Sequence, residues 1–129
     1  MTRFTLSKQE RLSSLKDIDL LFADGKSLVK YPIRLVWRHV PASEPVPVSA
    51  LFSVSKKKFS RAVDRNRIKR LLRESYRLLK PSFFASLPAD QCYHIGLIYV
   101  ATEILDLDSI QKSLSVALDR LTIEITQKQ

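Results

Sequence analysis

Hydrophobic residues follow the helical period in some parts of the chain and the two-residue period of strands in others. The first helical stretch follows Ser14, whose spacing to Asp17 resembles a capping box, and it ends before Gly25. Its apolar residues recur at helical spacing and are Leu15, Ile18, Leu21 and Phe22. The pattern predicts a first helix over residues 14–24.

Two strands are predicted next, because residues 31–40 and 48–55 alternate between apolar and more polar positions. The apolar positions of these strands are Ile33, Leu35, Trp37, Val48, Ala50, Phe52 and Val54. The proline-rich stretch 41–47 is predicted to be a connection, since proline cannot donate to a strand ladder. A further short strand is predicted near 28–30. Helices are expected to cover the apolar face of the sheet and to leave the polar face partly open.

The second half of the chain predicts a helix, a buried strand and a final helix. Asp64 suits the start of a helix and Pro81 its end. Residues 93–101 are apolar on both faces, as in a central strand. The last helix is predicted to open at Asp108, and its apolar stripe comprises Ile110, Leu114, Ala117, Leu118, Leu121 and Ile125. The order α-β-β-(β)-α-β-α indicates an α+β sandwich with helices packed on a mainly antiparallel sheet.

The length of 129 residues predicts a single domain, residues 1–129, with short flexible ends near 1–8 and 126–129. No apolar run approaches the roughly 20 residues that span a bilayer, and the N-terminus lacks the apolar stretch of a secretory signal. The single cysteine, Cys92, excludes an internal disulfide and suits a reducing compartment. These features predict a cytoplasmic protein.

Positive charge is concentrated in one segment of the chain. Residues 56–80 contain eleven basic residues against Asp64 and Glu74, which accounts for the whole net charge of +9. A neutral body with one basic segment indicates a polyanionic partner, with nucleic acid first and a membrane surface second. The alternative, a solvated charged helix face, normally mixes both signs.

The basic segment is predicted to be an amphipathic helix with a core face and a cationic face. The core face comprises Ile68, Leu71, Leu72, Ser75 and Leu79. The cationic face comprises Arg65, Asn66, Lys69, Arg70, Arg73 and Arg77, with Tyr76 and Lys80 inside it. Cations at this pitch suit successive phosphates, and such contacts position a protein without reading sequence. A membrane-surface helix needs a broader exposed apolar face, and a DNA-reading helix-turn-helix needs a preceding helix, whereas a strand precedes this one.

Two runs in this region carry a family resemblance. Residues 53–57 read SVSKK, and residues 62–74 read AVDRNRIKRLLRE after a short interval. Together they resemble the signature of the bacterial ribonuclease P protein, with weaker resemblance over most of the chain. The resemblance implies an α-β sandwich like the second domain of a small-subunit ribosomal protein, with a left-handed crossover through the basic helix. The chain departs from the family pattern at Ile18, where an aromatic residue is frequent, and at Phe59, where glycine is common.

The resemblance also implies a function and two binding surfaces. The protein would join a catalytic RNA and assist removal of the 5′ leader from precursor tRNA, with magnesium ions held mainly by the RNA and with the protein alone monomeric. The catalytic RNA would contact Lys56, Lys57, Arg61, Arg65, Asn66, Arg67, Lys69, Arg70, Arg73 and Arg77. A cleft between the first helix and the open sheet face would take the leader and be lined by Ile18, Phe22, Arg34, Val36, Arg38, Ser53, Asn66 and Lys69.

The sequence shows no constellation for chemistry by the protein itself. His39, His94 and Cys92 are too few for a tetrahedral metal site, and each is expected to be a strand residue. We expect no catalytic residue and no metal ligand in the chain, with the chemistry carried by the partner RNA. The alternative is a ribosomal or assembly protein that binds structured RNA without a catalytic outcome.

Overall fold

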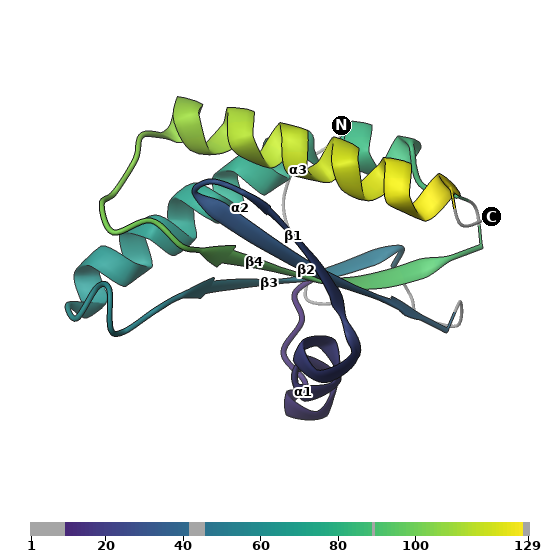
Figure 1. Ribbon diagram of the computed structural model, residues 1–129, viewed down its shortest axis with the longest axis horizontal. Helices are drawn as coiled ribbons and strands as arrows, with labels where there is room; N and C mark the ends of the chain where they lie inside the picture. The colour runs from purple at the N-terminus through teal and green to yellow at the C-terminus, as the bar shows by residue number, and fades with distance from the viewer. Residues whose placement is uncertain (1–9, 42–45, 89, 128–129) are drawn as a thin grey trace.

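The computed structural model of the protein describes residues 10–41, 46–88 and 90–127. It is an α+β structure in which three helices pack on a four-stranded sheet (Figure 1). In chain order the elements are α1 (Leu15–Asp24), β1 (Lys26–Lys30), β2 (Ile33–Val40), β3 (Val48–Val54), α2 (Ala62–Ala85), β4 (Cys92–Tyr99) and α3 (Leu107–Gln127). The predicted order is confirmed, including the short additional strand, which is β1.

The sheet has the strand order β1-β2-β4-β3. The first two pairs are antiparallel, whereas β3 and β4 are parallel. A parallel pair needs a crossover, and α2 provides it. β4 is the central strand that was predicted from its apolar character, with neighbours on both sides and almost every residue buried. Helices α2 and α3 lie on one face of the sheet and α1 lies alone on the other (Figure 1).

Two groups of apolar side chains lie on the two faces of the sheet. The larger group fills the space between the sheet and α2 and α3, and it includes the whole predicted stripe of α3. The smaller group lies under α1 and consists of Leu12, Leu21 and Val36, with Ile18, Leu51 and Ile98 packed against it. The expectation that helices cover the apolar face is confirmed, and α1 covers only part of the other face.

The first helix begins and ends as predicted. The Ser14 side chain accepts a hydrogen bond from the Asp17 amide, and Gly25 caps the other end. A Cβ atom on Gly25 would lie 2.2 Å from the Leu21 carbonyl oxygen and 2.9 Å from a methyl group of Val36. Glycine is therefore needed here because the chain passes very close to β2.

The outer edges of the sheet are covered by hydrogen bonds from other parts of the chain. Segment 10–12 pairs with β3, where the Leu12 amide donates to the Ala50 carbonyl at 2.9 Å. On β1, Arg120 of α3 donates to the Val29 carbonyl at 3.0 Å. These contacts occupy backbone groups that would otherwise be open to pairing with another strand.

Helix α2 does not stop at Pro81, so that prediction is wrong. The helix begins at Ala62, two residues before Asp64, and continues through Pro81 to Ala85. The apolar residues beyond the proline explain the extension, because Phe83 is buried and its ring lies 6.4 Å from that of Tyr76. Their packing outweighs the loss of one backbone donor at Pro81.

The last helix also begins slightly earlier than predicted. The Asp106 carboxylate accepts a hydrogen bond from the Ser109 amide at 2.9 Å, which caps the first turn. Hydrogen bonding by the Ser109 side chain, followed by that of its amide, lowers the pKa of Asp106. Of the ends predicted to be flexible, 1–8 and 128–129 lie outside the described residues, and 126 and 127 are the last residues of α3. Residues 42–45 of the predicted connection also lie outside them. Among the described helices, none has the length and apolarity needed to traverse a bilayer.

Candidate nucleic-acid interface

The first half of α2 presents a row of exposed polar and basic side chains. Asn66, Arg67, Arg70 and Arg73 are exposed on this helix. Within the described residues, the three arginines have no carboxylate at ion-pair distance. Lys56 and Lys57 in the preceding loop are exposed as well. This part of the predicted cationic face is therefore available to a polyanion.

A shallow hollow lies at the start of the same helix. It is lined by Arg61, Val63, Asp64, Asn66, Arg67 and Arg70. Arg61 and Asp64 approach to 3.9 Å, and the arginine is strongly exposed, so this contact is weak. Three guanidinium groups around one hollow suit bidentate contacts to phosphate oxygens.

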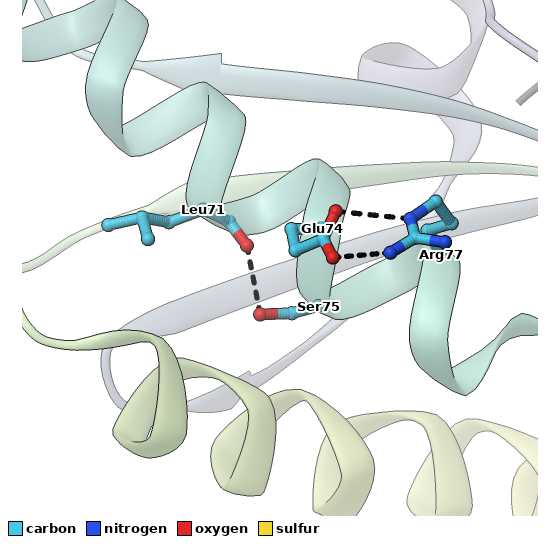
Figure 2. A network of polar contacts seen from close by, with 4 residues as sticks. All are labelled: Leu71, Glu74, Ser75 and Arg77. Carbon is cyan, nitrogen blue, oxygen red and sulfur yellow. Dashed lines mark hydrogen bonds and ion pairs between the residues drawn. The ribbon is translucent and has the colours of Figure 1, made fainter. Parts of the chain in front are cut away.

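Arg77 differs from the exposed row because it is paired on its own helix. Figure 2 shows the Arg77 guanidinium group facing the Glu74 carboxylate one turn away, with Nε donating to Oε2 at 3.0 Å. A second nitrogen contacts the other carboxylate oxygen. The hydrogen bond lowers the pKa of Glu74 and raises that of Arg77. Both groups are charged at neutral pH, and the predicted contact of Arg77 with a polyanion competes with this pair.

Arg65 holds the loop that leads into α2. The terminal nitrogen Nη1 of its guanidinium group donates to the carbonyl oxygens of Phe59 and Ser60, both at 2.9 Å. Phe59 is buried, and its ring lies 6.0 Å from that of Tyr99. A side chain thus fills the core at the position where the family commonly has glycine. The helical pattern placed Arg65 on the outer face, whereas the structure makes it part of the loop's own support.

Tyr76 and Lys80 also lie elsewhere than the sequence predicted. Tyr76 is fully buried, with its ring 5.8 Å from that of Phe52, so its prediction for the cationic face is wrong. Burial raises the pKa of its hydroxyl group. Lys80 pairs with Glu10 at 2.8 Å, and both side chains are nearly buried. The periodicity could not separate these flanking positions from the exposed row, because the core face is wider than the sequence suggested.

The face of the sheet under α1 carries most of the other predicted side chains. In the register of the sheet, Arg34 of β2 lies opposite Ile98 of β4, and Ile98 lies opposite Ser53 of β3. Arg34 is exposed, and Ser53 is half-buried at the end of β3, from which the loop leads back to α2. Asn66 and the half-buried Lys69 follow in the first turns of that helix. We call Arg34, Ser53, Asn66 and Lys69 the Arg34–Ser53 strip, in which the apolar Ile98 lies between Arg34 and Ser53.

Helix α1 contributes apolar side chains next to this strip. Phe22 is 48% exposed. Its ring lies 4.0 Å from the position that a Cβ atom on Gly96 would occupy. Ile18 is half-buried and packs against the small apolar group. An exposed aromatic ring above a sheet face is suited to stacking on an unpaired base.

Two of the predicted cleft residues are placed differently. Val36 is buried beneath α1, so its side chain contributes to packing. Arg34 and Arg38 lie on either side of Val36 in β2. The two arginines are about 13 Å apart along the strand, at roughly 3.3 Å per residue. The predicted set is therefore divided by α1. Sequence reasoning missed Leu51 and Ile98, which pack beside Ile18; alternation placed Leu51 on this face, but the pairing of β3 with β4 was not predictable.

No group of three or more metal-binding side chains is present within the part of the chain that the structure describes. His94 and Cys92 are buried in β4, and His39 is exposed on β2. All three are strand residues, as expected.

Comparisons with known proteins agree on one family. A family model described as Ribonuclease P matches residues 6–122. The protein named Ribonuclease P protein component from Porphyromonas gingivalis is 40% identical over 119 residues, which cover 92% of this chain and 87% of that protein. The solved RNase P protein of Staphylococcus aureus shares the fold, with a TM-score of 0.70 at 24% identity over 87% of this chain and 94% of that one.

A second solved structure, the RNase P protein from Thermotoga maritima, aligns with a TM-score of 0.67 and 26% identity. The alignment covers 86% of this chain and 96% of that one. Sequence and fold thus agree over nearly the whole chain, and the exposed basic row lies where the SVSKK and RNR runs of the sequence place it. The chain belongs to the ribonuclease P protein component family, and it is the partner of ribonuclease P RNA in a tRNA-processing endoribonuclease.

Proposed function

We propose that the first half of α2 binds the catalytic RNA through phosphate contacts. The observation that carries this proposal is the exposed row of Arg67, Arg70 and Arg73, which have no ion-pair partner within the described residues. Unpaired guanidinium groups on one helix face neutralise phosphates without reading bases. Lys56, Lys57 and Asn66 extend the same surface.

The Arg34–Ser53 strip and Phe22 bind the 5′ leader of precursor tRNA. The strip offers Arg34 for phosphate, the Ser53 hydroxyl group for hydrogen bonds and an exposed ring for stacking. Asn66 and Lys69 stand at its end, so one strand of RNA can pass from the strip toward the catalytic RNA.

The chemistry of leader removal belongs to the RNA subunit, with magnesium ions held mainly by RNA. The protein acts as a monomer in the cytoplasm, where bacterial tRNA precursors are made. Its contribution is to position the substrate and to offset phosphate repulsion between two RNA molecules.

The test is cleavage of precursor tRNA by the catalytic RNA at low magnesium concentration, with and without this protein. We expect the protein to restore cleavage at magnesium concentrations where the RNA alone is inactive. The protein alone, after nuclease treatment, should not cleave at any magnesium concentration. Cleavage by the nuclease-treated protein would contradict the assignment of chemistry to the RNA. Lack of any stimulation would contradict the accessory role and favour a binding protein without catalytic outcome.

A further inference from the structure

A second hollow lies at the end of the sheet remote from the loop that leads into α2. β3 and β4 are parallel and both end near that loop, so the start of β4 lies at the opposite end. The hollow has a volume of about 500 Å³, and Ile125 near the C-terminal end of α3 is part of its lining. Its lining includes Lys26, Trp37, Arg38, His39, Gln91 and Tyr93. We call it the distal hollow.

The floor of the distal hollow is aromatic. Trp37 and Tyr93 are almost buried, with ring centroids 6.5 Å apart in an edge-on arrangement. His39 is exposed, and its ring lies 5.3 Å from that of Tyr93. Three rings therefore lie together at one end of the sheet, and the exposed His39 ring among them is suited to a flat ligand.

The rim of the distal hollow is cationic and polar. The Lys26 ammonium group lies 5.6 Å from the centre of the Trp37 ring, and the half-exposed Arg38, which alternates with Trp37 and His39 along β2, is also part of the lining. Among the described residues, Asp24 is the one carboxylate in the lining, against the two cations Lys26 and Arg38. The Tyr93 hydroxyl group donates to Oε1 of Gln91 at 2.6 Å. That bond orients the Gln91 amide and leaves its NH₂ group as a donor.

We propose that the distal hollow binds an unpaired nucleotide of RNA. The base stacks on His39 above the Trp37–Tyr93 floor, the Gln91 amide donates to a base acceptor, and Lys26 and Arg38 contact the phosphate. The volume lies within the range of pockets that hold small ligands, roughly 300–1,000 Å³. A phosphate alone would not use the aromatic floor, and an uncharged aromatic ligand would not use the two cations.

The aromatic floor of this site is separate from both surfaces of the proposed function. The aromatic floor faces α3, whereas Phe22 and the Arg34–Ser53 strip lie on the α1 side of the sheet. The exposed row of α2 begins at the other end of the sheet. Arg38, which α1 separates from the remaining predicted cleft residues, is part of the lining of this site.

The experiment uses the intrinsic fluorescence of Trp37, the single tryptophan of the chain. The full-length protein is titrated with adenosine 5′-monophosphate, and separately with inorganic phosphate and with adenosine. We expect a saturable change with the nucleotide and at least tenfold weaker binding of phosphate and of adenosine. Lys26→Ala and His39→Ala should each raise the Kd for the nucleotide about tenfold, in line with the loss of one charged or stacking contact.

Lys30→Ala is the matched control, because Lys30 is exposed on the same strand and the same side of the sheet but at its other end. Its Kd should equal that of the wild type. Equilibrium dialysis with labelled nucleotide checks for binding that leaves fluorescence unchanged. No binding by either method, equally tight binding of phosphate or adenosine, or an unchanged Kd in both Lys26→Ala and His39→Ala would overturn the proposal. Arg70→Ala should bind the nucleotide normally while losing affinity for the catalytic RNA, so the two proposals fail independently.

Discussion

In the first half of α2, Arg67, Arg70 and Arg73 are exposed and have no ion-pair partner in the described part of the chain. In the second half, Arg77 and Lys80 each contact a carboxylate. The two halves have the same periodicity and were predicted as one cationic face. The difference shows that a count of basic residues overstates the interface: Arg67, Arg70 and Arg73 are available for binding, whereas Arg77 and Lys80 are engaged by carboxylates of the chain itself.

The greatest loss of stability is expected for a variant in the second half of α2. Lys80→Met removes the cation beside Glu10, whose side chain is nearly buried. Breaking a buried ion pair from one side costs about 3 kcal/mol or more, so the free energy of unfolding should fall by that amount in urea denaturation. Arg73→Met is the matched control, and it should change the free energy by less than about 0.5 kcal/mol. Equal losses in the two variants would show that the halves do not differ.

The next prediction concerns Phe22, which lies in α1 next to the Arg34–Ser53 strip and not in α2. Phe22→Ala should weaken the binding of precursor tRNA to the holoenzyme by about 1–3 kcal/mol, the contribution of one stacked base. Mature tRNA should bind almost as before. A fully buried phenylalanine would cost about 3–5 kcal/mol of stability, and the exposure of this ring predicts less. An unchanged ratio of precursor to mature tRNA affinity, with early thermal melting, would make Phe22 a core residue only.

Within the first half of α2, Arg65 differs from Arg70 because it binds the preceding loop. Arg65→Ala removes the hydrogen bonds to the Phe59 and Ser60 carbonyl oxygens, so the free energy of unfolding should fall by about 1–2 kcal/mol. Arg70→Ala should leave it unchanged, because no other part of the described structure binds that side chain. Identical denaturation midpoints for both variants would contradict the role of Arg65 in the loop.

The Glu74–Arg77 pair gives the smallest effect. Glu74→Gln releases the Arg77 guanidinium group, and RNA affinity should become slightly more salt-dependent, by less than one unit of log–log slope. The lowered pKa keeps Glu74 ionised at neutral pH, so the pair is present there and is lost as pH falls below the ordinary carboxyl range. Wild-type protein should therefore approach the behaviour of Glu74→Gln at low pH. A shallower slope in the variant would contradict the competition between Glu74 and phosphate.

The hydrophobic pattern of the sequence predicted helices and strands well where one period, helical or strand-like, continued along the whole segment. The α3 stripe, the cap at Ser14 and the central position of β4 followed from the sequence because each depends on neighbouring residues. The end of α2 did not, since the packing of Phe83 against Tyr76 comes from the tertiary fold and outweighs Pro81.

The sequence predicted which residue types form the candidate site, but it predicted only in part where those residues lie in the structure. The exposed arginines of α2 could be named from the sequence, whereas the partner of Lys80 lies 70 residues away in the chain. The separation of Arg34 from Arg38 by α1 depends on where that helix packs, which no spacing within β2 reveals. The distal hollow likewise combines the end of α1 with β1, β2, β4 and the C-terminal end of α3.

The salt dependence of catalytic-RNA binding measures whether the first half of α2 contacts RNA phosphates. If about five or six phosphates are neutralised, the slope of log K against log salt should be near −4, at roughly 0.7 per contact. The double variant Arg70→Ala/Arg73→Ala should have a slope shallower by a little more than one unit, with an unchanged free energy of unfolding. A slope near zero for the wild-type protein, or the same slope in the double variant, would contradict the assignment of catalytic-RNA binding to the first half of α2.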